Sequence, residues 1–600
     1  MSAAGTIVTP STPARTYPRQ RWVIAPAHPE ASEELARAAH LPRVVAELLV
    51  ARGIAQPHEA HAFLNPDITQ LHSPMLMRGM DVAVERLERA IAAREPILLY
   101  GDYDVDGTTA VVLLKTAIEM LGGVVRFHVP HRLLEGYGLQ SSVLEAAYSD
   151  GVRLVITVDT GMRAFAEAET ARRLGLDLII TDHHLPKVDD SVPAALAILN
   201  PNQAGCSYPE KSLCGAAIAL KLAQALLERR DHARTHAKTL PSFLKMAAVA
   251  TIADAVPLRG ENRVIAALGL RELRRPVAAG LRALFAASAL DPAAKELTGF
   301  DVAFRLAPRI NAAGRMDVAS QVIELFCTRD AARAHELATR LELLNRQRRD
   351  TEAAALASIE ARLSEDGDLA NCRLLVVDGD GWHRGVIGIL ASRVVERTAK
   401  PAIVISVEDG VAHGSGRSVD GFPLLEAIET CGDLFTRFGG HAFAVGFAMP
   451  AEALPELKRR LGIHADERLA ARDPEQLLHI HAELALDRIT AVLAGWLRKL
   501  EPLGHGNPEP IFAARHARLV GPPRVMKDRH IRLELAHDSA VSAGRSGVVR
   551  AVGWDWAARC MDLKLCEGSL VDVAYRIREN HHPEFGGIEV EIAGIRPAEA

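Results

Sequence analysis

The sequence predicts an α/β protein with a parallel-sheet domain, a smaller α/β domain joined to it by a long helix, and a C-terminal β-barrel. From Pro96 to about residue 330, apolar runs of strand type alternate with helical segments, as in a parallel sheet with crossover helices. The segment from Asp330 to about Leu363 contains neither proline nor glycine, which predicts one long helix. Beyond about residue 466, short runs alternate polar and apolar residues, as the strands of a small barrel do.

Chain length sets the expected number of domains. A chain of 600 residues is too long for one core and predicts about three to five domains. A tail rich in Pro, Ser, Thr and Ala should precede them. We expect a flexible N-terminal tail (1–35), a helical region (36–95), the parallel-sheet domain (96–330), a connector helix (331–365), the second α/β domain (366–465) and the barrel (466–600).

The elements of these domains follow one another in the expected order. In the parallel-sheet domain, strands are predicted at 96–100, 124–129, 153–158 and 177–181, with helices at 108–121 and 141–148. Residues 213–275 are mainly helical in pattern. Further strands are predicted at 373–377 and 401–405 in the second α/β domain, and at 530–535 and 588–592 in the barrel.

Composition indicates a globular protein without a membrane anchor. Hydrophobic residues make up 48% of the chain and charged residues 24%, which is ordinary for globular protein. The 7 cysteines form no C-x-x-C pair, so neither a zinc ribbon nor a disulfide framework is predicted. No apolar run approaches the ~20 residues of a membrane span and no apolar signal core begins the chain, so we expect a cytoplasmic protein. The net charge of −5 limits any nucleic-acid contact to local basic patches.

Three of the predicted strands end in side chains that bind hard metal ions. Asp102, Asp104 and Asp106 follow the first strand, Asp159 follows the third, and Asp182-His183-His184 follows the fourth. Carboxylates this close repel one another unless cations lie between them. Because ligands of parallel α/β sheets collect at the carboxyl ends of strands, these residues predict one metal site.

The acidic turn after the first strand also looks like the start of an EF-hand calcium loop. Such a loop needs a bidentate Glu at its twelfth position, which here is Leu113, and its flanks should be two helices rather than strand and helix. A solvated acidic turn is the other alternative. It does not account for Asp159 and the Asp182-His183-His184 triplet at the neighbouring strand ends.

These motifs resemble those of the DHH phosphoesterase superfamily, named for the Asp-His-His triplet, and within it those of the RecJ family of bacterial single-strand-specific exonucleases. The resemblance runs from about residue 40 to the C-terminus, and its motifs are highly specific when found together in this order. Further matching segments lie at 131–139, 251–258, 307–315, 381–388, 414–418 and 438–441. Tyr100 departs from the pattern, since related phosphoesterases and some RecJ sequences have His there, and this leaves the ligand set of one metal open.

The resemblance implies a DHH catalytic domain, a DHHA1-like companion domain and an OB-fold that holds single strands. It implies two Mn²⁺ or Mg²⁺ ions, a pair that activates water and neutralises phosphoryl charge. The implied ligands are Asp102, Asp104, Asp106, Asp159, His183 and Asp254. Asp159 is the expected bridge, and Asp102 is either a ligand or an acceptor behind the ligands. Without the resemblance, Asp254 would be a capping or salt-bridge residue near the end of an apolar helix.

The resemblance also implies contacts to the substrate at the reacting end. His184 should contact the scissile phosphate, and Asn311 and Arg315 should act with it in catalysis. Arg309 should complete a polar cluster with these two residues, facing the metals and the substrate.

A clamp for the 5′ phosphate is implied at Arg132, Ser415 and Arg417, with His441 as a further phosphate contact. Glycines, a hydroxyl and a guanidinium fork suit phosphate oxygens. From the residues alone, the Gly-Ser-Gly-Arg segment is equally an ordinary β-turn, and Arg132 is a surface arginine.

A basic run in the expected barrel should hold the strand away from the cut. Arg529 and Arg532 lie in this run, together with Arg524, Lys527 and His530. A solvated charged strand is the alternative that the pattern alone favours. Aromatic residues make up only 4% of the chain, which favours charge over extensive base stacking.

We therefore expect a metal-dependent 5′→3′ exonuclease that degrades single-stranded DNA to 5′-mononucleotides in recombination and repair. Its polarity and its preference for DNA rest on the resemblance, which also implies a single-strand-binding protein and a RecQ-type helicase as partners of a monomer. A phosphodiesterase for nanoRNA or cyclic dinucleotides, or a pyrophosphatase, would not need the barrel. An inactive binding scaffold would have no reason to retain repelling carboxylates.

Overall fold

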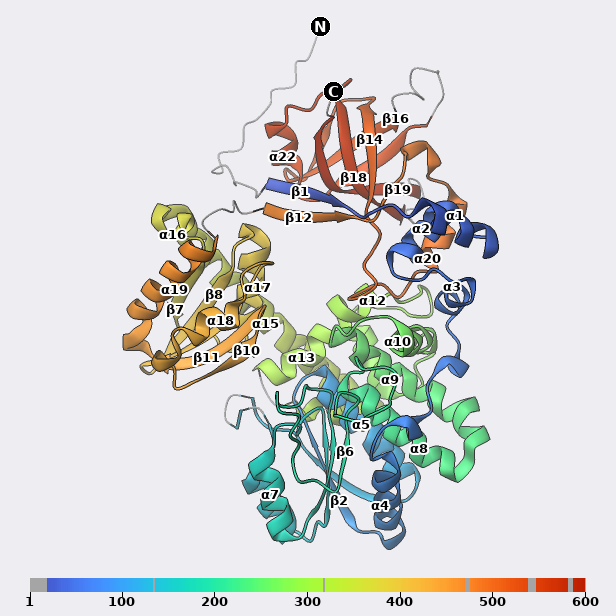
Figure 1. The fold of residues 1–600 in the computed structure, drawn as a ribbon, viewed down its shortest axis with the longest axis vertical. Helices are drawn as coiled ribbons and strands as arrows, with labels where there is room; N and C mark the ends of the chain where they lie inside the picture. Colours follow the sequence, from blue (N-terminus) through green and yellow to red (C-terminus); the bar gives the residue numbers. More distant parts are fainter. Residues whose placement is uncertain are drawn as a thin grey trace. The chain divides into compact units, whose positions relative to one another are not determined.

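The structure, a computed structural model, describes residues 19–132, 135–136, 138–316, 319–469, 475–537, 547–580 and 586–598 (Figure 1). The chain folds into two compact units. The parallel-sheet unit comprises residues 26–349 and 489–510. The barrel unit comprises the chain before residue 26, residues 350–488 and the chain from residue 511 onward. The predicted fold class, α/β with a second α/β domain and a C-terminal barrel, is confirmed.

The parallel-sheet unit is built on a five-stranded sheet in the order β3-β2-β4-β5-β6. Every neighbouring pair in it is parallel. Its strands are β2 (Pro96–Gly101), β3 (Val124–His128), β4 (Leu154–Val158), β5 (Asp177–Thr181) and β6 (Ala197–Leu199). The four strands predicted here form within a residue or so of their expected ends.

Both faces of this sheet are covered, which is why its central strands are apolar throughout rather than alternating. Ile97 and Leu99 of β2 pack into one core, and Leu98 and Tyr100 pack into a second core on the opposite face. The first core includes helices α4 (Met80–Ala93), α5 (Val105–Met120), α8 (Gly215–Arg234) and α9 (Leu240–Ala253). The second includes α6 (Ser141–Ser149) and α7 (Phe165–Leu174). In Figure 1, α7 and α4 accordingly lie on opposite sides of the sheet.

The remaining elements of this unit are helical, as predicted for residues 213–275. They are α1 (Pro29–Ala38), α2 (Arg43–Ala51), α3 (Pro57–Leu64), η1 (Ile68–Gln70), η2 (Pro74–Leu76), η3 (Thr235–Thr239), α10 (Gly260–Leu273), α11 (Ala279–Ala287), α12 (Gly299–Asp301), η4 (Val302–Leu306), α13 (Ala307–Met316) and α14 (Ser320–Cys327). Of these, η3 and η4 are π-helical turns.

Residues 489–510, which include α20 (Ala491–Arg498), pack with the parallel-sheet unit, although they lie within the limits that we expected for the barrel domain. The physical reason is Arg263 of α10, which is buried. Its guanidinium donates hydrogen bonds to the main-chain carbonyls of Lys499, Leu500 and Glu501 at 3.0, 2.9 and 2.8 Å. Burial lowers the pKa of Arg263 to about 9, and these carbonyls replace the hydration that it has lost.

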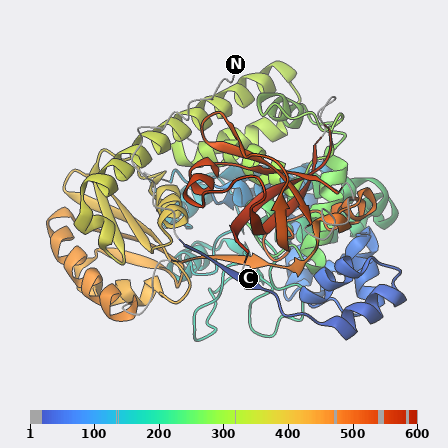
Figure 2. The same ribbon diagram turned by 90° about the horizontal axis from the view of Figure 1, so that it is seen from above.

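The predicted connector is α15 (Ala331–Glu365), a single helix of 35 residues that Figure 2 shows from the side. Leu337 and Leu341 in its first half pack into the core of the parallel-sheet unit. Leu356 and Ile359 in its second half pack into the core of the second α/β domain. Each half is therefore an integral part of a different core.

The second α/β domain contains a five-stranded sheet in the order β10-β11-β9-β8-β7. Its β7–β8 pair is parallel and the other pairs are antiparallel. Its elements are α16 (Gly367–Asn371), β7 (Leu375–Asp380), α17 (Ile387–Thr398), β8 (Ala402–Glu408), β9 (Val411–Arg417), α18 (Leu424–Glu429), η5 (Gly432–Leu434), β10 (Arg437–His441), β11 (Ala444–Pro450), η6 (Ala451–Ala453) and α19 (Leu454–Leu469).

The C-terminal sheet has the order β13-β14-β18-β19-β17-β16-β15, and a further pairing of β14 with β16 closes it into a barrel. Its elements are β13 (Ala482–Glu483), η7 (Leu486–Arg488), β14 (Phe512–Leu519), β15 (Arg524–Met526), β16 (His530–His537), β17 (Val549–Gly553), α22 (Ala557–Asp562), β18 (Leu570–Asn580) and β19 (Gly587–Pro597). Closure satisfies the strand edges that an open sheet would expose.

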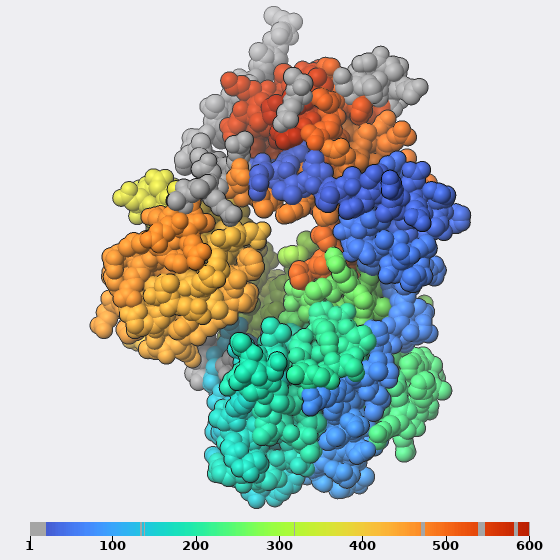
Figure 3. Space-filling view, viewed as in Figure 1, coloured from blue at the N-terminus to red at the C-terminus, as the bar shows by residue number. Residues whose placement is uncertain are grey.

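The prediction of a loose tail over residues 1–35 is wrong from residue 19 onward, and residues 1–18 lie outside the described residues. Strand β1 (Arg19–Ile24) pairs in parallel with β12 (Glu475–Ile480), and α1 begins at Pro29. The strand is held by Trp22, which packs beside Leu478 and lies 4.5 Å from the guanidinium of Arg596. Figure 3 shows the dark-blue β1 lying against the orange and red atoms of the barrel unit.

Candidate metal centre

Parallel strands bring three aspartates to one edge of the sheet. The last residues of β2, β4 and β5 are in register with one another. Asp102, Asp159 and Asp182 each follow directly, and their exposed fractions are only 6%, 2% and 1%. The lateral alignment of the strands is therefore what concentrates negative charge at this edge.

The turn from β2 into α5 carries two more carboxylates, Asp104 and Asp106. Asp104 caps α5, since its Oδ1 accepts a hydrogen bond from the Gly107 N–H at 3.0 Å. A Cβ on Gly107 would lie 2.5 Å from the carbonyl oxygen of Asp102, so this close approach of helix and turn requires glycine. The tight turn thereby keeps all three carboxylates of the acidic motif together.

Helix α8 presents its N-terminus to the same cluster. The N–H groups of Gly215 and Ala216 donate to the two Asp106 oxygens at 2.6 and 2.7 Å, where the helix dipole stabilises a carboxylate. A Cβ on Gly215 would lie 2.6 Å from the Asp159 Cβ, so only glycine allows α8 to come this close. The helix thus orients Asp106 and lies directly behind Asp159.

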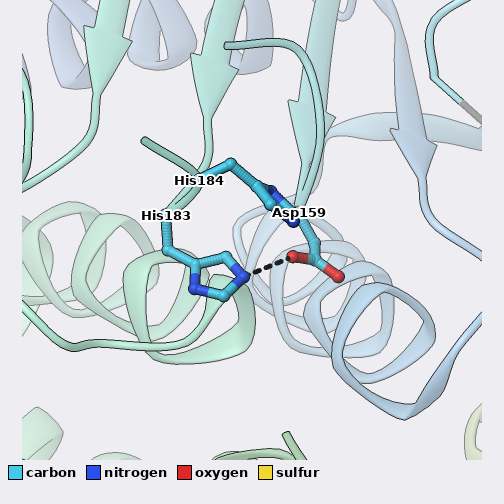
Figure 4. A group of neighbouring side chains, drawn as sticks. All are labelled: Asp159, His183 and His184. Atoms are coloured by element: carbon cyan, nitrogen blue, oxygen red, sulfur yellow. Dashed lines mark ion pairs between the residues drawn. The ribbon is translucent and has the colours of Figure 1, made fainter. Parts of the chain in front are cut away.

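Asp159 lies beside His183 at the centre of the cluster (Figure 4). The His183 Nε2 is 3.2 Å from Asp159 Oδ1, 3.8 Å from Asp106 Oδ2 and 3.9 Å from Asp254 Oδ2. Asp159 has a left-handed backbone with φ of 61°, a conformation that costs a non-glycine residue about 1–3 kcal/mol. Strain of this kind at a buried carboxylate is typical of functional positions.

The Asp182 carboxylate holds His184. Its Oδ1 lies 2.7 Å from the His184 Nδ1 and also accepts the His184 main-chain N–H, while its Oδ2 accepts the N–H of Met162. Burial disfavours a charged imidazole, but the hydrogen bond with Asp182 and the negative charges of Asp182, Asp102 and Asp254 together outweigh it and raise the pKa of His184 to about 9. The sequence placed Asp182 among the metal-binding side chains at the strand ends but did not predict that it orients His184.

Burial and mutual repulsion raise the pKa of four carboxyl groups in the cluster. The pKa of Asp102 rises to about 8 because of burial and then Asp104, and that of Asp254 rises to about 8 because of burial and then Asp106. The pKa values of Asp104 and Asp159 are raised by burial and then by Asp106. Two buried oxygens, Oδ1 of Asp102 and Oδ1 of Asp159, have no hydrogen-bond partner in the described part of the chain. Divalent cations would relieve the repulsion and occupy these oxygens, so the donor set fits them.

The ligand atoms converge in three overlapping groups. Within each group, one ligand atom from every residue lies within 4.8 Å of the others. The groups are Asp102, Asp104 and Asp159; Asp106, His183 and Asp254; and Asp159, His183 and His184. Asp159 and His183 each belong to two groups, and of the two only the carboxylate has a pair of oxygens that can bind two ions at once. Hard carboxylate oxygens with imidazole suit Mn²⁺ and Mg²⁺.

Tyr100, the departure from the family pattern, is buried behind the cluster. Its hydroxyl donates to the Gly138 carbonyl at 2.8 Å, and its ring centroid lies 5.2 Å from that of His128. Tyr100 therefore braces the loop after β3 and does not enter the three ligand groups.

Asparagines behind the cluster fix its loops. Asn311 of α13 accepts a hydrogen bond from the Val105 N–H at 3.1 Å, which holds the first turn of α5. Asn200 and Asn202 donate to the main-chain carbonyls of the two triplet histidines at 2.8 and 3.0 Å. Sequence reasoning missed the latter two, although a polar residue directly after β6 was the available signal.

The three predicted arginines of the parallel-sheet unit have different surroundings. The Arg132 guanidinium lies over the Tyr103 ring, 5.1 Å from its centroid. Arg315 is largely buried, and burial followed by repulsion from Arg132 lowers its pKa to about 10. The Nε of Arg309 lies 2.6 Å from an oxygen of Glu342, so its charge is already compensated.

In the barrel unit, Ser415 and Arg417 lie beside the start of α17. A Cβ on Gly388, in the first turn of that helix, would be 3.2 Å from the Ser415 Oγ and 3.4 Å from an Arg417 nitrogen. The Arg417 guanidinium donates to the Ser415 Oγ and the Gly416 carbonyl at 3.3 and 2.8 Å, and burial lowers its pKa. A hydroxyl, a guanidinium and a helix N-terminus together make an anion-binding set.

Of the other predicted contacts of the barrel unit, His441 and Arg529 are exposed and Arg532 is half-buried. His441 is exposed at the end of β10. Arg532 on β16 lies opposite Arg524 on β15, while Arg529 is exposed and pairs with Asp555 at 3.3 Å. Basic side chains of the predicted run therefore lie along the β15–β16 hairpin.

Trp554 is an exposed aromatic residue that sequence reasoning missed. Its exposed fraction is 55%, and its ring stands edge-on to that of His530 with centroids 5.0 Å apart. The chain has few aromatic residues and no run of them marks this position. The available signal was a single tryptophan directly after β17.

Three family models match the chain. The DHH family N-terminal domain matches residues 96–251, the DHHA1 domain residues 371–462 and the RecJ OB domain residues 480–593. Among the described residues, no helix combines the length and apolar character that a membrane crossing requires.

Similar proteins share most of the chain. The RecJ single-stranded-DNA-specific exonuclease of Dickeya dadantii is 36% identical over 82% of this chain and 86% of its own length. The protein of that name from Bacillus subtilis is 36% identical over 87% of this chain, which spans 65% of that relative. The crystal structure of RecJ from Thermus thermophilus in complex with Mn²⁺ has a TM-score of 0.81 and 29% identity, and covers 97% of this chain and 80% of its own.

Proposed function

The chain belongs to the RecJ family of single-stranded-DNA-specific exonucleases, and on that premise we propose that it releases 5′-mononucleotides from the 5′ end of single-stranded DNA. It does so in DNA recombination and repair. The observation that carries the chemistry is the buried cluster of carboxylates and imidazoles at the edge of the parallel sheet. A cluster of overlapping ligand groups is what two-metal hydrolysis of a phosphodiester requires.

Mn²⁺ or Mg²⁺ ions would be held by Asp102, Asp104, Asp106, Asp159, His183 and Asp254. Bound there, two such ions supply an activated water and neutralise the charge that builds on the phosphoryl group. The oxygens of Asp102 and Asp159 that accept no hydrogen bond support a ligand role for both, and a carboxylate shared by two ligand groups supports Asp159 as the bridge. The Mn²⁺ and Mg²⁺ complexes of Thermus thermophilus RecJ support the choice of metal.

His184 is the proposed contact to the scissile phosphate. Asp182 engages the ring through Nδ1, so Nε2 is the nitrogen that would donate to a phosphate oxygen. Arg315 and Arg132 would add positive potential for the incoming strand, and Asn311 would act by holding the turn that carries Asp104 and Asp106. Arg309 is a weaker candidate because Glu342 already pairs with it.

Ser415 and Arg417 would bind the 5′ phosphate at the start of α17, and His441 would add a contact at the surface. A terminal monoester phosphate carries more charge than an internal diester, so a guanidinium beside a helix N-terminus favours the end of the strand. In a strand whose only terminal phosphate is at the 5′ end, this preference supports 5′→3′ polarity.

The barrel would hold the strand beyond the cut. Arg529 and Arg532 would contact backbone phosphates, and Trp554 would stack on a base, which is how barrels bind single strands without sequence preference. A single-strand-binding protein and a RecQ-type helicase would supply strands to a monomeric enzyme. Acting in recombination and repair, the enzyme would be cytoplasmic.

End-labelled substrates test the proposal directly. With Mn²⁺ and a single strand labelled at the 5′ end, the label should appear as mononucleotide from the first time point. The same strand labelled at the 3′ end should give a ladder that shortens with time, while duplex DNA should resist. Early release of a 3′ label, or internal cuts on a circular single strand, would contradict the assignment.

A further inference from the structure

A glutamate and two histidines converge at the end of α8 that lies far from the carboxylate cluster. We propose that Glu228, His232 and His236 form a separate binding site for a divalent transition-metal ion of the zinc type. The site lies wholly within the parallel-sheet unit and is independent of the nuclease proposal.

The convergence arises from a break in the helix. In a continuous α-helix, Glu228 and His236 would be about 12 Å apart along the axis, too far to share an ion. The chain leaves helical geometry at Asp231, with φ of −160° and ψ of 92°, and then passes into the π-helical turn η3. As a result, the Glu228 Oε1 lies 2.7 Å from the His236 Nε2.

The break is built into the local sequence. Asp231 starts the new helical segment by accepting the Arg234 N–H at its Oδ1 (3.0 Å), and its carbonyl accepts the buried Thr235 hydroxyl (2.7 Å). His232 and His236 then stand four residues apart on one face of that segment. Two imidazoles at this spacing on a helix can bind one zinc ion.

The three side chains offer a donor set that suits zinc. One ligand atom from each lies within 4.8 Å of the others. Gln224 Nε2 donates to Glu228 at 2.7 Å and holds the carboxylate in place. Two histidines and a glutamate are the protein ligands of an open zinc site, with solvent completing the coordination.

Solvent can reach the site, and the His232 ring can rotate to become its third ligand. The exposed fractions of the Glu228 and His236 side chains are 18% and 34%, and His232 is exposed. The His232 ring lies 4.4 Å from that of His236, and within the described residues its nitrogens have no hydrogen-bond partner. A rotation of this one ring would bring its nitrogen to an ion held by the other two residues.

A hydrogen bond between Glu228 and His236 that merely stabilises the break is the alternative. That role needs no third residue, so His232 separates the two interpretations. A bound ion would fix the geometry of the break between α8 and α9. Helix α8 carries Gly215 and α9 ends at Asp254, and both residues lie beside the carboxylate cluster. By helix rise along α8, the ion would be roughly 20 Å from that cluster.

Zinc binding by the full-length protein tests the proposal. The chain is stripped with a chelator, returned to excess Mg²⁺ and titrated with Zn²⁺, and bound zinc per chain is measured by calorimetry and elemental analysis. Because carboxylates and imidazole can also bind Zn²⁺ at the carboxylate cluster, the difference in bound zinc between wild type and variants is the readout. Wild type should bind one equivalent more than His232→Ala and than Glu228→Gln, and Zn²⁺ should raise the Tm of wild type more than that of either variant.

His58→Ala removes an exposed histidine of α3 outside the cluster and should bind zinc as wild type does. His232→Ala should keep the circular dichroism spectrum and the Mn²⁺-dependent nuclease activity, since it touches neither the fold nor the carboxylate cluster. Equal zinc equivalents in wild type and His232→Ala would overturn the proposal. So would a loss in Glu228→Gln that His232→Ala does not share, because that result reports the hydrogen bond alone.

Discussion

Asp182 and His184 form a pair in which the carboxylate binds both the ring and the main chain of the same histidine, at 2.7 Å to Nδ1 and 3.1 Å to the N–H. A single aspartate thus sets the orientation of the imidazole and the path of the loop that carries it. We expect Asp182→Asn to lower kcat about 10- to 100-fold with little change in KM, because the ring loses its fixed orientation. Steady-state kinetics on a short single strand measure this, with the exposed Asp189→Asn as control. A rise in KM at constant kcat would instead assign Asp182 to substrate binding.

The proposed metal ligands should lower the stability of the protein when no metal is bound. Asp159→Asn removes a buried, repelling charge and keeps a residue type that tolerates the left-handed backbone. We expect activity to fall by several orders of magnitude. In EDTA the variant should melt above wild type, and in saturating Mn²⁺ below it, since binding at about 100 times Kd adds about 2.7 kcal/mol to wild type. Scanning calorimetry with and without Mn²⁺ decides this; unchanged hydrolysis by the variant would end the two-metal assignment.

The close packing of α8 against the carboxylate cluster should not accommodate one added methyl group at Gly215. Gly215→Ala places a Cβ 2.6 Å from that of Asp159, and the shift it forces displaces the N–H donors of Asp106. We expect Mn²⁺ affinity to fall at least tenfold and Tm to drop by several degrees. Calorimetric titration with Mn²⁺ measures the first effect. The control is Gly462→Ala in α19, where a Cβ meets nothing within 4 Å; equal behaviour of the two variants would refute the packing argument.

Arg417 should discriminate between strand ends. Arg417→Ala should weaken kcat/KM for 5′-phosphorylated strands by about 1.5–3 kcal/mol, or roughly 10- to 150-fold, and affect 5′-hydroxyl strands much less. Competition between the two substrates in one reaction measures the ratio. Arg459→Ala removes an exposed arginine of α19 and should leave the ratio unchanged. Equal losses on both ends would reject the phosphate role.

The barrel should contribute binding that depends on salt and on strand length. Arg532→Ala combined with Lys527→Ala should raise KM for long single strands while cleavage of a dinucleotide changes little. Each lost phosphate contact should also reduce the slope of log K against log salt by about 0.7. Fluorescence titration at several salt concentrations tests this. A double variant with the wild-type slope would show that these side chains do not grip the strand.

The metal cluster was readable from the sequence because its causes are local. Asp102, Asp159 and Asp182 each follow an apolar run directly, and parallel strands align whatever follows them. Asp254 does not follow a predicted strand, and only the family resemblance identified it as a candidate ligand. The role of Asp182 could not be read, because it depends on which way each side chain of the triplet turns.

Two segments pack in places that the predicted domain limits did not indicate, and main-chain contacts hold both of them. Arg263 binds residues 499–501 through carbonyls that every sequence has, so no pattern marks that segment as part of the parallel-sheet unit. Strand β1 is likewise fixed by backbone pairing with β12, more than four hundred residues away in the sequence. Deleting everything after residue 461 would therefore strip Arg263 of its partners. Point substitutions on the barrel surface are the cleaner test of its function.

The left-handed backbone at Asp159 also limits which genetic changes this position can absorb. Asparagine and glycine are the replacements that adopt such a conformation most readily, and each is one base change from an aspartate codon. Either would silence the proposed bridge while relieving the charge repulsion around it. A lineage that no longer needed the nuclease could therefore keep a folded, strand-binding protein after a single mutation, and the identity of this residue would distinguish an active gene from an inactive one.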